Sequence, residues 1–275
     1  MNRRVSTVSR SAGSTVKRTR RRYGGAPRDE RLNRPETNAV LTSLSRADYQ
    51  WLATGLKRVS LAVGQRLLTA GEDVQFVYFP TTAIISLVHA SDDGAMTELA
   101  VIGKEGVVGM GLFSEGRFTV NAVVQTGGIA FCVDAALIRQ ATSKGGALPG
   151  LLLRYADVLF QQLSRVAVSS QHSSVEQQLC RWLLEHLDRS ASNELRATQE
   201  WISLMLGVRR ESITSAAMKL QHAGLIRYRR GTIVVEDRCG LERHAGGYYR
   251  RPENGVQPSD RCWQGSGKTS SPWRC

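Results

Sequence analysis

Several side chains able to hydrogen-bond to base edges lie between residues 209 and 219. Arg210 carries a planar guanidinium whose paired donors match guanine O6 and N7, and Glu211 can accept a hydrogen bond from cytosine N4. This chemistry suits the base edges in the major groove of double-stranded DNA. We predict that the following residues contact bases: Arg209, Arg210, Glu211, Ser212, Thr214 and Ser215.

Two short helices joined by a glycine turn are predicted to position these side chains. Thr198 is the expected N-cap of the first helix, and Gly207 is expected to end it. The second helix is expected to run from Arg209 to about His222. Two helices in this order, the second opening with basic and hydroxyl residues, are typical of a helix-turn-helix unit.

A basic hairpin is predicted directly after the second helix. Residues 225–235 form two apolar runs around a tight turn that contains Gly231. Such a hairpin is a wing, and arginines at its tip would meet phosphates, which add affinity without reading sequence. Each of these pieces also occurs in proteins that do not bind DNA, but their order within about 40 residues favours DNA binding. The predicted phosphate contacts are Thr198, Gln199, Lys219, Arg227, Arg229 and Arg230.

A long helix is predicted upstream, over residues 149–172. Its apolar residues follow spacings of four and three, which is typical of a coiled-coil seam. Two interpretations remain: the helix packs on its own domain, or it pairs with a second copy of the chain. The apolar flanking residues Leu151, Leu153 and Val158 widen the band and favour a homodimer. The predicted seam consists of Leu152, Ala156, Leu159, Leu163 and Val166.

Residues 58–133 are predicted to form short strands divided by glycines and other turn residues, a pattern typical of an antiparallel barrel or jelly roll. Asp93-Gly94 is expected to turn one hairpin of this barrel. On the strand after that turn, Met96, Glu98 and Ala100 are expected to share one face. The predicted fold class is therefore α+β, with an antiparallel β jelly roll, a long dimerisation helix and a C-terminal winged helix-turn-helix.

Charge and composition divide the chain into five parts. The net charge is +13, and residues 1–35 hold eleven basic side chains against two acidic ones, with few apolar residues. Such a segment cannot bury enough surface to offset its ordering entropy. We predict a disordered basic tail (1–35), a sensor domain (36–148), a dimerisation helix (149–172), a DNA-binding domain (173–245) and a second disordered tail (246–275).

Several other classes of protein are disfavoured by the residues present. The five cysteines show no C-x-x-C spacing, so we predict no metal site and no cofactor. His89 is the single histidine between residues 37 and 171, which argues against a cupin-type metalloenzyme. We expect no catalytic residues and no enzyme activity. No sufficiently long apolar segment is present for a membrane span, and we predict a cytoplasmic protein that does not bind membranes.

Four stretches resemble bacterial Crp/Fnr-type transcription regulators, namely residues 78–82, 109–116, 176–184 and 206–214. The resemblance covers residues from about 37 to 245. It implies a cyclic-nucleotide-binding-like jelly roll, a homodimer on an inverted-repeat operator, and RNA polymerase as a further partner. It also matches Arg210 and Glu211 to the first two base-contacting positions of the family. Ser215 stands where cAMP-responsive members have an arginine, so their operator sequence is not expected here.

The predicted effector pocket departs from the family pattern. Cyclic-nucleotide binders use a glutamate for the ribose hydroxyl and an Arg-Ser or Arg-Ala pair for the cyclic phosphate. Alignment puts Gly109 at the glutamate and Thr119-Val120 at the pair, with Arg117 two residues away. The predicted pocket residues are Gly109, Gly111, Leu112, Phe113, Arg117 and Thr119.

An anionic nucleotide in that pocket would lie among unpaired polar groups, which costs several kcal/mol. We therefore predict an unknown small-molecule effector in place of cAMP or cGMP. Two alternatives remain open. The first is a regulator of the cyclic-nucleotide-responsive kind, in which a shifted loop recruits Arg117, and the second is a structural relative that does not bind DNA.

Overall fold

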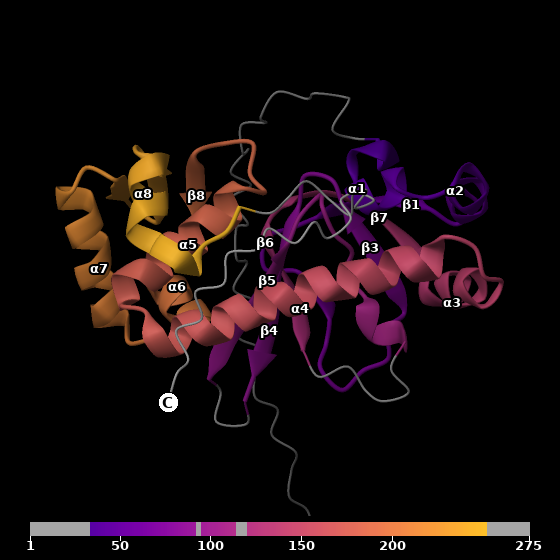
Figure 1. Ribbon diagram of the computed structural model, residues 1–275, viewed down its shortest axis with the longest axis horizontal. Coiled ribbons are helices and arrows are strands. Elements are labelled where there is room, and N and C mark those ends of the chain that lie inside the picture. Colours follow the sequence, from indigo (N-terminus) through magenta and orange to yellow (C-terminus); the bar gives the residue numbers. More distant parts are fainter. Residues whose placement is uncertain (1–33, 92–94, 114–119, 252–275) are drawn as a thin grey trace, which may run out of the picture.

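The computed structural model describes residues 34–91, 95–113 and 120–251 (Figure 1). The predicted N-terminal tail lies outside the described residues except for its last two. The expected Asp93-Gly94 turn and the candidate pocket residues Arg117 and Thr119 also lie outside them.

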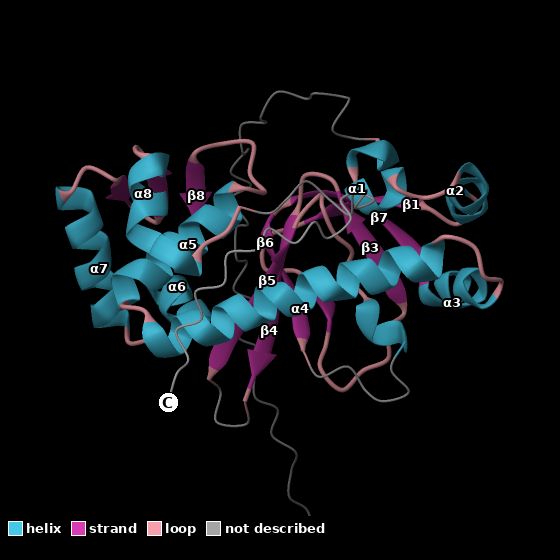
Figure 2. Cartoon of the chain, in the orientation of Figure 1, coloured by secondary structure: helices cyan, strands magenta, loops and turns pink. Residues whose placement is uncertain are grey.

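The N-terminal half is an antiparallel barrel of two facing sheets, as the sequence predicted. One sheet has the order β1-β7-β3 and the other β2-β6-β4-β5, and every strand pair in them is antiparallel (Figure 2). The strands are β1 (Lys57–Leu61), β2 (Arg66–Leu68), β3 (Phe76–Pro80), β4 (Ile84–Ala90), β5 (Met96–Ile102), β6 (Asn121–Thr126) and β7 (Gly128–Asp134). Short helices flank the barrel: α1 (Ala39–Thr42), α2 (Arg46–Ala53), the 3-10 helix η3 (Met110–Phe113) and α3 (Ala135–Ser143).

A bulge in β5 changes the predicted pattern of its faces. Leu87 pairs with Ala100, whereas the next residue, Val88, pairs with Glu98, so Leu99 is an extra residue opposite them. Paired residues share a face and consecutive residues lie on opposite faces. Glu98 and Ala100 therefore lie on opposite faces of the sheet. The expectation that they share a face is wrong, because the bulge inserts one residue into the alternation.

Helix α4 (Leu148–His172) crosses the molecule from the barrel to the C-terminal module (Figure 1). This module contains the remaining elements: α5 (Val175–Leu187), β8 (Glu194–Arg196), α6 (Gln199–Leu206), α7 (Arg210–His222), β9 (Ile226–Arg229), β10 (Thr232–Val235) and α8 (Arg238–Ala245). Its three strands form a sheet of order β8-β10-β9.

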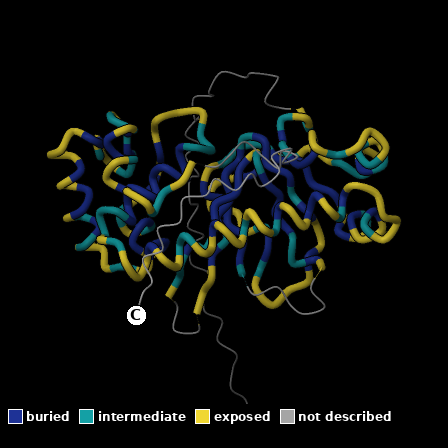
Figure 3. The backbone as a smooth tube through the Cα atoms, viewed as in Figure 1, coloured by how far each residue is buried: buried dark blue, intermediate teal, exposed yellow. Residues whose placement is uncertain are grey.

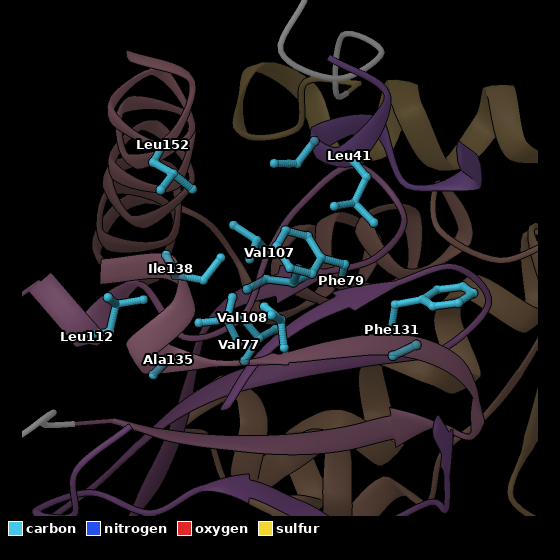
Figure 4. Packing of buried hydrophobic residues seen from close by; sticks show 14 of the residues in the cluster. Leu41, Val77, Phe79, Val107, Val108, Leu112, Phe131, Ala135, Ile138 and Leu152 are labelled. Carbon is cyan, nitrogen blue, oxygen red and sulfur yellow. The ribbon is translucent and has the colours of Figure 1, made fainter. Parts of the chain in front are cut away.

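Each half has its own hydrophobic core, visible as two groups of buried backbone in Figure 3. The barrel core includes Phe79, Val108 and Ile138, together with Leu152 from α4 (Figure 4). The second core lies in the C-terminal module but also takes in Val88 from the barrel, with Met96 packed against it. The β4–β5 hairpin therefore joins the barrel to the C-terminal module through apolar contacts.

The C-terminal disorder predicted from residue 246 is wrong for its first residues. Residues Gly246–Tyr248 form a 3-10 helix, and the Tyr248 hydroxyl donates to the carbonyl of His172 at 2.9 Å. The Tyr249 hydroxyl donates to Asp188 Oδ2 at 2.8 Å and accepts from Arg238 Nη2 at 2.8 Å. Two aromatic hydroxyls with distant partners order a Gly-rich segment that has no periodicity of its own. The rest of this tail, from residue 252, lies outside the described residues.

Candidate nucleic-acid interface and its supporting domain

The helix-turn-helix is built from local signals that the sequence carries. Thr198 Oγ1 accepts from the backbone N–H of Trp201 at 3.1 Å and caps α6. Gly207 ends that helix with φ +65°, a left-handed conformation that glycine adopts without strain. Arg209 is the N-cap of α7, so the helix begins at Arg210, one residue later than predicted. Ile213, Ala217 and Leu220 bury the inner face of α7 in the core of the C-terminal module.

The outer face of α7 carries the predicted base contacts. Arg209, Arg210, Glu211 and Ser215 are exposed, whereas Ser212 and Thr214 are half-buried. Thr214 is already engaged, because its hydroxyl lies 2.7 Å from Gln199 Oε1 on α6. This hydrogen bond holds the two helices together. The structure thus brings the predicted residues to one end of α7, with two arginines and a carboxylate outermost.

The wing is a two-residue hairpin whose tip is Arg230-Gly231. Both residues have positive φ, +49° and +77°, as a tight hairpin turn requires. Arg229 and Arg230 are exposed at this tip, as predicted. Arg227 is not at the tip. It pairs with Val234 farther down the strand, and its guanidinium forms an ion pair with Glu236 at 3.0 Å.

Ion pairs distinguish the predicted phosphate contacts from one another. Lys219 pairs with Glu176 on α5, and Arg227 pairs with Glu236. Within the described residues, no ion pair is present at Arg209, Arg210, Arg229 or Arg230. The unpaired arginines lie on the first turn of α7 and on the wing tip.

One basic residue beside the wing was not predicted from the sequence. Arg196 lies on β8, an unpredicted third strand, and is exposed directly opposite Thr232 at the wing tip. The sequence signal for this strand was an alternation of polar and apolar residues over only three positions, Glu194-Leu195-Arg196, of which Leu195 alone is buried. So short a strand forms only because β10 supplies its partner.

The predicted effector pocket is only partly where it was expected. A cavity of about 220 Å³ lies between the barrel and α4. Gly109 lines it, but Leu112 belongs to the barrel core, Phe113 is exposed, and Gly111 is not in the lining. The lining residues are Leu87, Leu99, Ala100, Ile102, Val107, Val108, Gly109, Met110, Val120, Leu159 and Leu163.

The backbone at Gly109 disfavours the glutamate that cyclic-nucleotide binders carry at the aligned position. Its φ is +121°, a conformation that residues with side chains rarely adopt. A Cβ added there would also approach the Cα of Val77 to 3.2 Å. The absence of this carboxylate is therefore built into the local backbone as well as the sequence.

Helix α4 presents a different apolar row to solvent from the one predicted. Leu152 is buried in the barrel core, Leu159 is half-buried and lines the cavity, and Leu163 lines its edge. Leu152 is therefore not available for a second chain, because the barrel already covers that side of α4. Ala156 and Val166 are half-buried. The exposed apolar side chains of α4 are Leu153, Val158, Phe160, Leu163 and Val168, with Leu153 at 73% and Phe160 at 67% exposure.

A group of polar and ionisable residues, buried or half-buried and termed the joint below, connects the barrel to the C-terminal module. The barrel side contributes Ser86, Glu98 and Glu105, and the module contributes Arg181, Glu185, His186 and Arg189. Arg189 Nε donates to Glu105 Oε1 at 2.5 Å and Arg181 Nη1 donates to Glu185 Oε2 at 2.8 Å. These two ion pairs balance four of the charges.

Glu98 and His186 are the remaining pair in the joint. Ser86 Oγ donates to Glu98 Oε2 at 2.5 Å, and His186 Nε2 lies 3.6 Å from the same oxygen. The other imidazole nitrogen, Nδ1, lies 2.9 Å from the carbonyl of Trp182, so Nδ1 carries the proton of a neutral ring. Burial raises the pKa of Glu98 to about 8, and burial lowers the pKa of His186 to about 3. Both groups are therefore uncharged near pH 6.

Comparison with known proteins agrees with this architecture. Residues 177–244 match the family described as the Crp-like helix-turn-helix domain. No curated protein sequence matches the chain. Among solved structures, a transcriptional regulator of the crp/fnr family from Eubacterium rectale superposes with a TM-score of 0.64 at 18% identity, over 76% of this chain and 99% of that one.

Two further structures have the same fold. FixK2 from Bradyrhizobium japonicum has a TM-score of 0.60 at 15% identity and covers 70% of this chain and 98% of its own. TTHB099, a CRP-family transcriptional regulator from Thermus thermophilus, has a TM-score of 0.59 at 18% identity, with coverages of 71% and 100%. The chain thus combines a Crp-like helix-turn-helix domain with the fold of Crp/Fnr regulators.

Membrane-spanning helices are a separate question. In the part of the chain that the structure describes, no helix is both long and apolar enough to span a membrane.

Proposed function

We propose that the chain is a transcription regulator of the Crp/Fnr type, a homodimer that binds an inverted-repeat operator in double-stranded DNA, with α7 in the major groove and the wing on the phosphate backbone. The observation that carries the proposal is the first turn of α7, where Arg209, Arg210 and Glu211 are exposed. Arg229 and Arg230 on the wing tip, and Arg196 beside it, extend this basic surface. The exposed recognition face disfavours the alternative of a structural relative that has lost DNA binding.

Arg210 is the residue whose role in sequence readout is easiest to test. Genomic fragments retained by the protein are sequenced, and the selection is repeated with Arg210→Ala. If Arg210 donates two hydrogen bonds to a guanine, the variant weakens specific binding by about 1–3 kcal/mol and loses the preference at one position in each half-site. Arg66→Ala, on an exposed strand residue of the barrel, is the control and retains the native preference. An unchanged preference in Arg210→Ala removes this residue from the readout.

The wing arginines should behave differently, because phosphate contacts carry no sequence information. We expect Arg229→Ala and Arg230→Asn each to weaken binding to all duplexes alike and to lower the salt slope by about one unit. Asparagine is used at residue 230 because it tolerates the positive φ found there. A wing variant that alters the selected sequence but leaves the salt slope intact would contradict this assignment.

The exposed apolar side chains of α4 support the homodimer. Leu153 and Phe160 are seven residues apart, so they lie on the same side of the helix. A dimer through this side would place two recognition helices for half-sites about one helical turn apart. Sedimentation should give a dimer for the native chain and a monomer for Leu153→Asp/Phe160→Asp, with Val63→Asp on the barrel as the exposed control. A native monomer at micromolar concentration would refute the proposal.

We infer that the barrel is the sensor of this regulator, and that RNA polymerase is its further partner in the cytoplasm. The alternative of a cyclic-nucleotide effector is disfavoured by the backbone at Gly109 and by the apolar lining of the cavity. Calorimetric titration of cAMP and cGMP into the full chain should give no saturable binding tighter than about 1 mM, which corresponds to about −4 kcal/mol. Saturable micromolar binding would restore the alternative in which Arg117 is recruited.

A further inference from the structure

We propose that the effector is a small uncharged apolar molecule that binds in the cavity between the barrel and α4. This inference rests on the proposed function, in which the barrel is the sensor, and it assigns a chemical class to the ligand. The cavity has a volume of about 220 Å³, and side chains from both the barrel and α4 line it. An apolar cavity of about 150 Å³ stays dry and can hold benzene, so this one has room for a fused two-ring or similar molecule.

Among the described residues, the lining offers no side chain that could pair with a charge. All eleven lining residues are apolar or glycine. The backbone polar groups of Val108 are also occupied, because its N–H donates to Tyr78 O at 2.9 Å and its carbonyl accepts from Tyr78 N at 2.8 Å. A charged ligand would lose its hydration without compensation, whereas an apolar ligand gains about 25 cal/mol for each Å² of surface that it buries. The cavity therefore selects against ionised molecules such as nucleotides.

The position of the cavity also gives an occupant access to the rest of the molecule. Leu159 and Leu163 belong to α4, whose exposed apolar side is the proposed dimer surface. Leu87 and Leu99 belong to β4 and β5, and the neighbouring Val88 and Glu98 contact the C-terminal module. A ligand in the cavity would thus touch the two structural elements that connect the barrel to the helix-turn-helix.

The test compares two probes of nearly equal size in the full-length protein. 2-Naphthol is uncharged at pH 7, and 2-naphthoate has the same rings with a carboxylate. Both are titrated calorimetrically into the native chain. We expect saturable binding of 2-naphthol, at least tenfold tighter than that of 2-naphthoate. Equal affinities, or no saturation by 2-naphthol up to its solubility limit, would overturn the proposal.

Filling the cavity locates the bound probe. Leu99→Trp places a larger side chain in the lining and should weaken 2-naphthol binding at least tenfold. Met110→Trp fills the cavity from η3 and serves if Leu99→Trp does not fold. Val63→Trp, where the native side chain is exposed on the barrel, should bind like the native protein. Native affinity in a folded filling variant would show that the probe binds elsewhere and would overturn the proposal.

Binding of duplex DNA is measured on the same proteins without probe. If 2-naphthol fails to bind while specific DNA binding persists, the inference about the ligand is wrong and the proposed function stands. If DNA binding fails while 2-naphthol binds as expected, the proposed function fails and the cavity remains a ligand site.

Discussion

Strands β4 and β5 have two faces with opposite chemistry. Their inner face, with Leu87 and Ala100, lines an apolar cavity. Their outer face, with Ser86 and Glu98, belongs to the joint. There the Arg181–Glu185 ion pair and a neutral Glu98–His186 pair are buried, and the Arg189–Glu105 ion pair is partly buried. The apolar face has room to accept a ligand, whereas the polar face depends on every partner being present. An empty apolar site forgoes packing contacts, but an incomplete polar site leaves an uncompensated charge.

Breaking an ion pair in the joint should have the largest effect on stability. Arg181 and Glu185 are 4% and 5% exposed, so Arg181→Ala leaves the Glu185 carboxylate buried without its partner. We expect the free energy of unfolding to fall by about 3–5 kcal/mol in urea denaturation. The double variant Arg181→Met/Glu185→Met removes both charges and should recover most of the loss. A loss below about 1 kcal/mol in the single variant would mean that water reaches this pair.

The pH dependence of stability should reveal the Glu98–His186 pair. Glu98 titrates near 8 in the folded state against 4.5 ordinarily, so its contribution is present at low pH and is lost as the pH rises toward 8. His186 titrates near 3 against 6.5, so its contribution is present above pH 6.5 and is lost as the pH falls. Between pH 6.5 and 8 the native state holds one more proton than the unfolded chain. The free energy of unfolding should therefore fall there by up to about 1.4 kcal/mol per pH unit.

Glu98→Gln isolates this contribution, because the amide cannot ionise. The variant should lose the fall in stability above pH 6.5. It should also lose stability as the pH drops below 6.5, because in the native protein Glu98 cancels the opposite effect of His186 between about pH 4.5 and 6.5. Urea denaturation of both proteins from pH 5 to 8.5 gives the difference. If the unfolding free energies of the native protein and of Glu98→Gln fall in parallel above pH 6.5, another group causes the pH dependence of the native protein.

Adjacent residues on β4 give a smaller contrast in packing. Leu87 lines the cavity, so Leu87→Phe has space for the larger ring, and we expect the free energy of unfolding to stay within about 1 kcal/mol of native. Val88 is fully buried in the core of the C-terminal module, and Val88→Phe should cost about 1–3 kcal/mol by overpacking. Thermal or urea unfolding measures both. Equal costs at the two sites would indicate that the cavity collapses in solution.

An exposed ion pair should show the smallest effect. Lys219 is solvent-exposed where it pairs with Glu176, and we expect Lys219→Ala to change the free energy of unfolding by less than about 1 kcal/mol without DNA. A loss of unfolding free energy as large as that of Arg181→Ala would show that burial does not explain the difference between the Lys219–Glu176 and Arg181–Glu185 pairs.

The helix-turn-helix was predictable because its signals act over a few residues. The Thr198 cap, the left-handed Gly207 and the Arg230-Gly231 turn each depend on the chemistry of one residue and its close neighbours. The basic residues of α7 could be placed on its exposed face from helical spacing alone. The identity of the base contacts and the phosphate contacts stays a prediction.

What the sequence alone determined, then, was the order and type of the elements and the local caps and turns that bound them. The tertiary structure decided which faces met. A single bulge at Leu99 moved Glu98 to the face opposite Ala100, and the barrel covered Leu152 while leaving Phe160 exposed. The Tyr249 hydroxyl donates a hydrogen bond to Asp188, which lies 61 positions earlier in the chain. The periodicity of a sequence shows which face of a helix or strand is apolar. What packs against that face is set by contacts between residues far apart in the chain, and no local pattern encodes those contacts.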